Sequence, residues 1–388
     1  MTRRVSDRTV ALALTLVPFA SIGLTRFGFG PLLPAMRADL LWSYFDGGLA
    51  TTFNAGGYLT GAIFGAGASR RFGDRAVIVW GTVGMALTLL GTALSGAFGP
   101  ILIFRFGAGL FGGLAFVAAA TMATQLSKTT VPSALVWFPG GAGLAILISA
   151  LGLPTVEEVF GGWKPGWIAL AIVTGIAALI LALTIPENRS EHVAQTSKIV
   201  EKIRGLEISY ALFGLGYISY ATFVVAYVRD GGADVSTVLV WGTLGAATVA
   251  SAFVWPSLFA RYSAGVMYPF TLAMCAAGVA LIIIDRSAVT AVISASLFGA
   301  SALAVVSGGS AAARDRVRPE SWGAAIGRLT ATFGVGQMLG PLLGGALGDT
   351  SSGLQLGLGA SAAILAAGAV VAVIDHQGTR NTAALSAA

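Results

Sequence analysis

Apolar stretches of about 20 residues recur along this chain, and they constrain its fold more than any other feature. A helix needs ~20 mostly apolar residues to cross the hydrocarbon core of a bilayer. Hydrophobic residues make up 56% of the 388 residues, and charged residues make up only 10%, where a soluble domain carries about 25%. The sequence therefore predicts an all-α integral membrane protein.

Twelve such stretches can be counted, and the longest polar stretch divides them into six and six. We predict transmembrane helices at 9–33, 45–68, 76–96, 100–126, 133–153, 166–185, 208–228, 236–258, 266–284, 288–310, 321–347 and 354–374. The domain organisation that follows is an N-terminal six-helix bundle (1–185), a linker (186–207) and a C-terminal six-helix bundle with a short tail (208–388).

The basic residues indicate how the chain is oriented. Sixteen of the 23 Lys and Arg residues fall in the loops and termini of one side, and four fall on the other side. Cytoplasmic loops carry the excess of Lys and Arg, so both termini and the linker are predicted to be cytoplasmic, in a bacterial inner membrane. These charges lie in short clusters between apolar runs, a pattern typical of membrane topology rather than of nucleic-acid binding.

The two halves of the sequence match each other in register. Adding 191 to a position in the first half gives a corresponding position in the second half, without a gap. The matched pairs include Gly23 with Gly214, Arg26 with Tyr217, Arg70 with Arg261, Gly143 with Gly334, and Trp137 with Arg328. Parallel repeats of this kind build transporters whose substrate site lies near the membrane midplane, between the repeats.

Three arginines interrupt the predicted spans, namely Arg26, Arg105 and Arg328. A charged side chain within a membrane is costly, and it normally faces a protein interior or a watery cavity. Because a guanidinium matches a carboxylate or phosphate bidentately, we predict that these arginines bind an anionic substrate. The structural alternatives are an ion pair of Arg26 or Arg105 with Asp46, and a role for Arg328 in the basic cluster at its helix end.

Other polar and aromatic residues complete the predicted substrate site, with ordinary helix packing as the alternative for each. Tyr217 and Tyr220 offer hydroxyl donors on the seventh helix, and Asn54 and Gln337 offer buried amides. Trp137 is included as the repeat mate of Arg328. The stretch Gly23–Pro34 around Arg26 contains three glycines and two prolines, which allow the first helix to bend.

Several motifs resemble those of the major facilitator superfamily over essentially the whole chain. GAGASRRFGDR (65–75) resembles its signature between helices 2 and 3, and RFGAG (105–109) is similar to its Arg-x-x-x-Gly element. TRFGFGPLLP, FPGGAGLAI, GLGYISYATF and TFGVGQMLGPLLGG resemble the bacterial YbfB/YjiJ-type branch. The resemblance implies the major facilitator fold, with two pseudo-symmetric bundles that rock between inward-open and outward-open states.

The same resemblance implies a set of gating residues. Ser69 or Arg70 stands where the signature has an acidic residue, so the gating salt bridge is either missing or made by Asp74. We assign gating to Arg70, Arg71, Asp74 and Arg75 in this loop, and to Asp46 at the outer start of the second helix.

We therefore predict a secondary active transporter, a symporter or antiporter, that moves a small organic anion through a cavity between the bundles. The alternative is a drug or metabolite efflux antiporter with an apolar, aromatic cavity and structural arginines. No Asp or Glu lies near the middle of a span, so coupling would use a proton carried by the substrate, exchange, or neither.

Other classes of protein fit the sequence less well. An intramembrane enzyme needs a nucleophile with its base, or a metal cluster, and the spans offer neither a histidine nor a central carboxylate. A membrane sensor needs an output domain, for which the 22-residue polar stretch is too short. We expect no catalytic residues, cofactor, metal or nucleic acid, and a monomer in the bilayer.

Overall fold

The chain folds into a bundle of long helices, seen in a computed structural model that describes residues 5–131, 133–187, 203–230, 236–318 and 321–387. Every regular element within these ranges is a helix. The first long helix consists of α1 (Asp7–Leu14), α2 (Leu16–Pro18), η1 (Phe19–Phe27) and α3 (Phe29–Leu40). The N-terminal bundle continues with α4 (Tyr44–Phe72), α5 (Asp74–Leu94), α6 (Phe98–Thr129), α7 (Ala134–Phe160) and α8 (Lys164–Thr184). The C-terminal bundle contains α9 (Arg204–Asp230), α10 (Thr237–Arg261), α11 (Ala264–Ile284), α12 (Ala288–Arg314), α13 (Trp322–Gly348) and α14 (Gly353–Ala387).

The predicted fold class is confirmed, because each of the twelve predicted segments coincides with one long helix of the described chain. Ten of the helices are long and apolar enough to cross a membrane. The other two, α4 and α13, have 29 and 27 residues, so they are long enough but less apolar. Both are rich in glycine and pack against each other between the bundles. Of the predicted linker, residues 188–202 lie outside the described residues, and the domain boundaries stay a prediction.

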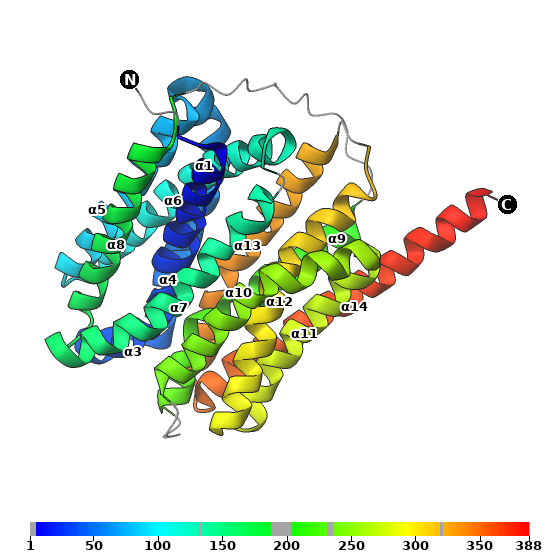
Figure 1. Cartoon of the computed structure of the whole chain (residues 1–388). Coiled ribbons are helices and arrows are strands. Elements are labelled where there is room, and N and C mark those ends of the chain that lie inside the picture. The colour runs from blue at the N-terminus through cyan, green and yellow to red at the C-terminus, as the bar shows by residue number, and fades with distance from the viewer. Residues whose placement is uncertain (1–4, 132, 188–202, 231–235, 319–320, 388) are drawn as a thin grey trace.

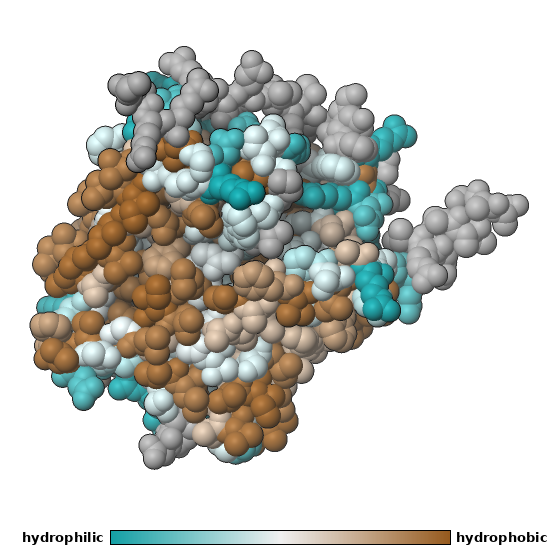
Figure 2. Space-filling view, viewed as in Figure 1, coloured by the Kyte–Doolittle hydropathy of each residue, from teal (hydrophilic) through white to brown (hydrophobic). Residues whose placement is uncertain are grey.

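The outer surface of the helices is apolar. In Figure 2, brown side chains cover the middle of the visible face, and teal side chains gather toward its two ends. Exposed residues such as Trp80, Leu183, Phe253 and Ile284 belong to this apolar surface. A bilayer satisfies such a surface in its hydrocarbon core while the polar ends meet water.

The two ends of the molecule differ in charge. We call the end where α1 begins the basic end, because Arg70, Arg71, Arg261 and Arg314 lie in the last turns of α4, α10 and α12 there. We call the other end, where α4 begins and α9 ends, the far end. In Figure 1 the basic end is at the top, the helices of the N-terminal bundle (blue to green) lie mainly on the left, and α9, α11, α12 and α14 lie on the right.

The bundles contact each other in a pattern that follows the sequence repeat. Gly30 and Ala221 are 191 residues apart, and a side chain at Gly30 would collide with the carbonyl oxygen of Ala221. Gly143 of α7 packs on Val249 of α10, and its repeat mate Gly334 of α13 packs on Leu59 of α4. Each fifth helix thus crosses the second helix of the other bundle, as the pseudo-symmetry predicts.

At the far end, Asp349 joins the bundles by capping a helix of the opposite bundle. Its two carboxylate oxygens accept hydrogen bonds from the backbone N–H groups of Tyr44 and Phe45, at 2.7 and 2.9 Å. These groups open α4, where backbone donors lack a partner within the helix and the helix dipole favours a negative charge. The end of α13 therefore stabilises the start of α4.

The end of α9 makes two further contacts with the N-terminal bundle at the far end. Asp230 accepts a hydrogen bond from the Tyr44 hydroxyl and pairs with Arg37 at 3.5 Å. The neighbouring Arg229 pairs with Glu157 of α7 at 3.7 Å. Each exposed ion pair of this kind contributes little to stability. Together with the Asp349 cap, however, they connect the far ends of α9 and α13 to the N-terminal bundle.

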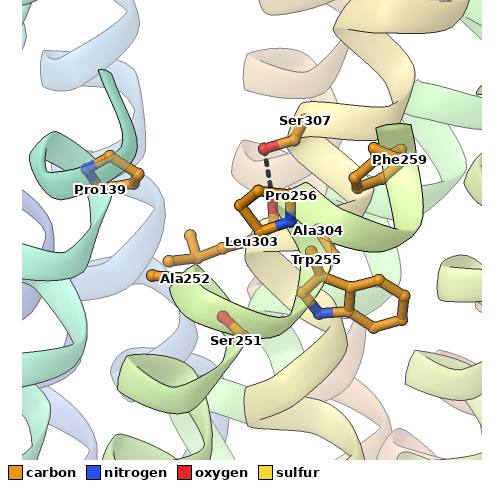
Figure 3. A pocket seen from close by; sticks show the side chains of 9 residues that line it. All are labelled: Pro139, Ser251, Ala252, Trp255, Pro256, Phe259, Leu303, Ala304 and Ser307. Carbon is orange, nitrogen blue, oxygen red and sulfur yellow. Dashed lines mark hydrogen bonds between the residues drawn. The ribbon is translucent and has the colours of Figure 1, made fainter. Parts of the chain in front are cut away.

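Toward the basic end, a cavity separates the bundles. Figure 3 shows Pro139 of α7 on one side, and Ser251 and Ala252 of α10 with Leu303 of α12 on the other. The cavity has a volume of about 180 Å³ and a mostly apolar lining. The described polar contacts between the bundles thus gather at the far end, whereas this cavity lies toward the basic end.

We expect Asp349→Ala to loosen the far end, because it leaves two N-terminal amides of α4 without an acceptor. A lost helix cap costs about 1 kcal/mol, which corresponds to about a fivefold change in an equilibrium. Thr222 is buried between the bundles, 3.4 Å from Thr51. A Thr222→Cys reporter in a Cys275→Ser background should therefore react about fivefold faster with a membrane-impermeant maleimide applied to the far end.

Asp285→Ala is the matched control for this prediction. Asp285 is an exposed carboxylate that binds only groups of its own loop among the described contacts, and hydrogen bonds from Ser287 and Thr290 lower its pKa. Labelling at Thr222 should not change in this variant. Equal labelling rates in the Asp349→Ala and wild-type backgrounds would show that the cap does not hold the far end closed.

Candidate functional site

The first helix changes its winding where it carries Arg26. Residues Phe19–Phe27 form a π-helix, and Gly28 donates its N–H to the carbonyl of Gly23, five residues back, at 3.0 Å. Such segments are rare and occur frequently at functional sites. Pro18 precedes the segment, and Gly23 packs directly on Ala145 of α7. The π-helix overlaps the stretch Gly23–Pro34, whose glycines and prolines are expected to allow a bend, and it includes Arg26.

Arg26 crosses the interface between the bundles. Its Nη1 donates to Oε1 of Gln337, on α13, at 2.9 Å, and its guanidinium lies 4.7 Å from the ring centre of Tyr58, on α4. The side chain is 7% exposed, and Nη2 has no hydrogen-bond partner among the described residues. The Nε2 of Gln337 is likewise buried and without a partner there. Two buried donors, one from each bundle, therefore lack a hydrogen-bond partner beside the Arg26–Gln337 hydrogen bond.

Arg105 is fully buried inside the N-terminal bundle. Its Nη1 donates to the backbone carbonyl of Thr25, next to Arg26, at 2.6 Å. The rings of Phe29 and Trp167 lie 4.7 and 5.2 Å from its guanidinium, and its Nε and Nη2 have no partner among the described residues. Arg105 therefore contacts the backbone that carries Arg26 and is not exposed toward the other bundle.

No carboxylate of the described residues pairs with Arg26 or Arg105. The alternative of an ion pair with Asp46 is not seen, because Asp46 and Ser43 form a capping box at the start of α4. An arginine at mid-membrane depth costs about 2.5–3.5 kcal/mol on insertion scales, and a cation–π contact recovers about 0.5–2 kcal/mol. An anion bound beside Arg26 would remove most of that cost.

The structure places Tyr217, the repeat mate of Arg26, beside the segment that carries Arg26. The ring of Tyr217 lies 6.1 Å from that of Phe27, the residue that follows Arg26. Tyr220 instead points into the C-terminal bundle, where its hydroxyl lies 2.8 Å from that of Ser294. Of the two predicted tyrosines, Tyr217 is at the bundle interface.

Three other predicted substrate residues make their described side-chain contacts with residues other than Arg26. Asn54 donates to the carbonyl of Arg105 at 3.1 Å and links α4 to α6. Trp137 is half-buried at the basic end and packs on a small cluster that includes Ala11. Arg328 is half-exposed at the basic end and pairs with Glu207, with nitrogen–oxygen distances of 2.6 and 2.8 Å. Their predicted role in substrate binding therefore stays a prediction.

The predicted gating residues sit at the ends of α4 and α5. Arg70 and Arg71 are exposed, and Asp74 is buried in the first turn of α5. Arg75 donates to the carbonyls of Ala182 and Ile185 at 2.8 Å and pairs with Glu187, so it ties α5 to α8 within one bundle.

Sequence reasoning missed the polar contacts between the bundles at the far end and the aromatic residues around Arg26. The far-end residues are Arg37, Tyr44, Glu157, Arg229, Asp230 and Asp349. The aromatic residues are Phe27, Tyr58, Trp241 and Phe333. Tyr58 follows Asn54 by one helical turn, and that spacing was a usable signal.

Comparisons with known proteins agree with this architecture. The model of a family described as "Uncharacterised MFS-type transporter YbfB" matches residues 19–373. A Bacillus subtilis (strain 168) protein, the uncharacterized MFS-type transporter YceJ, is 27% identical over 219 residues, which are 52% of this chain and 54% of that protein. The match thus spans about half the length of that relative.

Two solved structures share the fold at low sequence identity. A crystal structure of a mutant of the nucleoside transporter NupG aligns with a TM-score of 0.75 and 15% identity, covering 95% of this chain and 99% of that one. A bacterial homologue of the human lysosomal transporter Spinster, in an inward-facing and unoccupied conformation, aligns with a TM-score of 0.68 and 15% identity. That alignment covers 96% of this chain and 97% of the other.

We expect Arg26→Met to raise the melting temperature of the ligand-free protein, because it removes a buried charge without a carboxylate partner. Replacing buried charges by apolar side chains of similar volume is often neutral or stabilising. Arg328→Met is the matched comparison, and it should lower the melting temperature because it leaves Glu207 without its partner. Scanning fluorimetry of both purified variants measures this, and a clear loss of stability in Arg26→Met would contradict it.

Proposed function

The chain belongs to the YbfB-type family of major facilitator superfamily transporters, and we propose that it moves a small organic anion across the membrane by alternating access. Family membership makes it a multi-pass membrane transporter and not an enzyme. The anionic substrate, the mode of coupling and the orientation are our proposals.

One observation carries the anion proposal. Arg26 is buried on the interface between the bundles, with one guanidinium nitrogen free and without a carboxylate partner among the described residues. A charge of this kind is stabilised best by a ligand of opposite sign, and a bidentate carboxylate satisfies it most fully. Arg105 adds a second positive charge behind the same helix and, through Thr25, holds the backbone next to Arg26.

The contacts between the bundles support a state that is closed at the far end. The ion pairs and the helix cap of that end would have to break for the site to open there, while the cavity beside Pro139 lies toward the basic end. We propose that the basic end, with both termini, faces the cytoplasm of a bacterial cell, so that this state is inward-facing in the inner membrane.

Coupling follows from what the spans contain. The described carboxylates lie near helix ends, apart from Asp375 of α14, which pairs with Arg316 at the basic end. We therefore find no proton relay at mid-membrane depth in the described part of the chain. We propose that the substrate carries its own proton or is exchanged for another anion. Since Arg26 and Gln337 come from the same chain, one monomer supplies both sides of the site.

The alternative is transport of an uncharged or cationic apolar compound, for which the arginines would be structural. The aromatic rings next to Arg26 favour this alternative, and the structural neighbour NupG is a nucleoside transporter. Thermal-shift measurements with acetate, succinate, benzoate, uridine and tetraphenylphosphonium separate the two, because a ligand of the folded state raises its stability. Stabilisation by the cation or the nucleoside alone would favour the alternative.

We expect Arg26→Gln to abolish uptake of the stabilising anion into proteoliposomes, since the neutral amide cannot balance its charge. The expected loss is at least about 30-fold, in line with the 2–5 kcal/mol lost when one partner of a buried charge pair is removed. Arg328→Gln is the matched control, because that arginine already has a carboxylate partner, and it should keep most of the activity. Unchanged uptake in Arg26→Gln would remove Arg26 from the site.

The orientation gives a separate prediction. Alkaline phosphatase is active only when exported, so a fusion after Ala388 should be inactive and a fusion within the loop at Asp285 should be active. A green fluorescent protein at the same two positions should give the reverse result. Phosphatase activity at Ala388 would place the basic end outside.

A further inference from the structure

Aromatic rings surround the unsatisfied donors of Arg26 and Gln337. In the first helix, the ring of Phe27 lies 6.1 Å from Tyr217 and 5.9 Å from Trp241. The ring of Tyr58, on α4, lies beneath the guanidinium of Arg26. Both bundles therefore contribute aromatic surface to the space around one charge.

The rings of the C-terminal bundle form an ordered wall. Phe213 and Phe333 stack with an interplanar angle of 15° and a centroid distance of 5.2 Å. Tyr217 lies 6.1 Å from Phe333 and stacks on Phe298 with an angle of 6°. Phe333 and Tyr58 are half-buried, whereas Phe213 and Phe298 are fully buried. The accessible ring of the wall is thus Phe333, one helical turn from Gln337, and the half-buried ring of Tyr58 faces Arg26 from the N-terminal bundle.

The two free donors belong to side chains that a hydrogen bond already joins. Nη2 of Arg26 and Nε2 of Gln337 are in the same planar groups as the two atoms of the Arg26–Gln337 hydrogen bond. Both side chains are more than nine-tenths buried, and both atoms lack a partner among the described residues. A carboxylate has two acceptor oxygens, and each of these donors can satisfy one.

From these contacts, and resting on the proposed function, we propose that the substrate is an aromatic monocarboxylate. Its carboxylate binds Arg26 and Gln337, and its ring packs against Phe333, Tyr58 and the edge of Tyr217. An aliphatic anion of the same charge would satisfy the donors but not the aromatic faces, which gain from a further ring in stacked or edge-on contact.

The charge count favours a monoanion. Arg26 is the intramembrane arginine with a free donor on the bundle interface. Arg105 is completely buried and directed to the carbonyl of Thr25, and Arg328 is neutralised by Glu207. A second carboxylate or a phosphate dianion would therefore carry a charge without a partner in the site, which is costly in a medium of low dielectric.

The test compares ligands that differ in one feature each, by isothermal titration with the full-length protein in detergent. Benzoate, phenylacetate and indole-3-acetate carry a ring and a charge, cyclohexanecarboxylate lacks the aromatic system, acetate lacks the ring, and benzamide lacks the charge. We expect the best aromatic acid to bind at least tenfold more tightly than acetate. It should bind about 2- to 12-fold more tightly than cyclohexanecarboxylate, and benzamide should not bind.

Phe333→Leu tests the wall directly, because it keeps an apolar side chain but removes the ring. The preference for the aromatic acid over cyclohexanecarboxylate should fall to about one, with acetate affinity unchanged. Phe270→Leu is the matched control, because Phe270 is an exposed ring on α11. This variant should keep the preference for the aromatic acid.

The outcomes separate this inference from the proposed function. If cyclohexanecarboxylate and acetate bind as tightly as the aromatic acids, and Arg26→Gln abolishes all binding, the aromatic inference is overturned and the anion proposal stands. If benzamide binds as well as benzoate and Arg26→Gln has no effect, both are overturned. Failure of all three aromatic acids to bind overturns the aromatic inference.

Discussion

The structure depends on a constraint of the bilayer, in which every backbone polar group must be satisfied within the protein. Continuous helices meet that constraint, so the side chains that remain polar in the spans are few and each needs a reason. Most of them here bond to a carbonyl one turn back, as Thr25, Thr82 and Thr174 do. Arg26, Arg105 and Gln337 retain donors without partners in the described structure, as Ser21, Tyr227 and Trp241 also do. The two arginines differ from the others because the unsatisfied group carries a charge.

Hydrophobic segment length and the 191-residue register predicted nearly all of the fold, because both can be read from the sequence without knowing which residues are in contact. The helix boundaries fall within a few residues of their predicted positions, apart from ends such as those of α3 and α14 that extend further. The register predicted that Arg26 and Tyr217 would occupy equivalent places, and Tyr217 lies beside Phe27, the neighbour of Arg26, at the interface. The contact between Gly30 and Ala221 shows why, because the first helices of the two bundles cross there and bring their equivalent residues together.

The candidate site could be predicted only in part, because hydropathy does not reveal a partner that lies far away in the sequence. Arg26 and Arg328 look alike as charges within apolar runs, yet Arg328 pairs with Glu207 of a different helix, whereas Arg26 meets an amide. Arg105 similarly resembles a cavity residue but is directed to the carbonyl of Thr25. The far-end contacts of Asp230 and Asp349 were missed for the same reason. An acidic residue at a helix end does not reveal from the sequence that its partner is on the opposite bundle.

The position of Arg26 on the interface also connects ligand binding to movement of the bundles. A ligand shifts a conformational equilibrium only by its difference in affinity for the two states. A carboxylate bound by both Arg26 and Gln337 needs a donor from the first helix and a donor from α13 at a fixed separation. Its affinity would therefore depend on how the bundles lie relative to each other. The Asp349 cap and the ion pairs of Arg229 and Asp230 stabilise one such arrangement, in which the far end is closed. Binding of the proposed anion and closure of the far end would thus both depend on how the two bundles lie relative to each other, and a change in either would alter the free energy of the other.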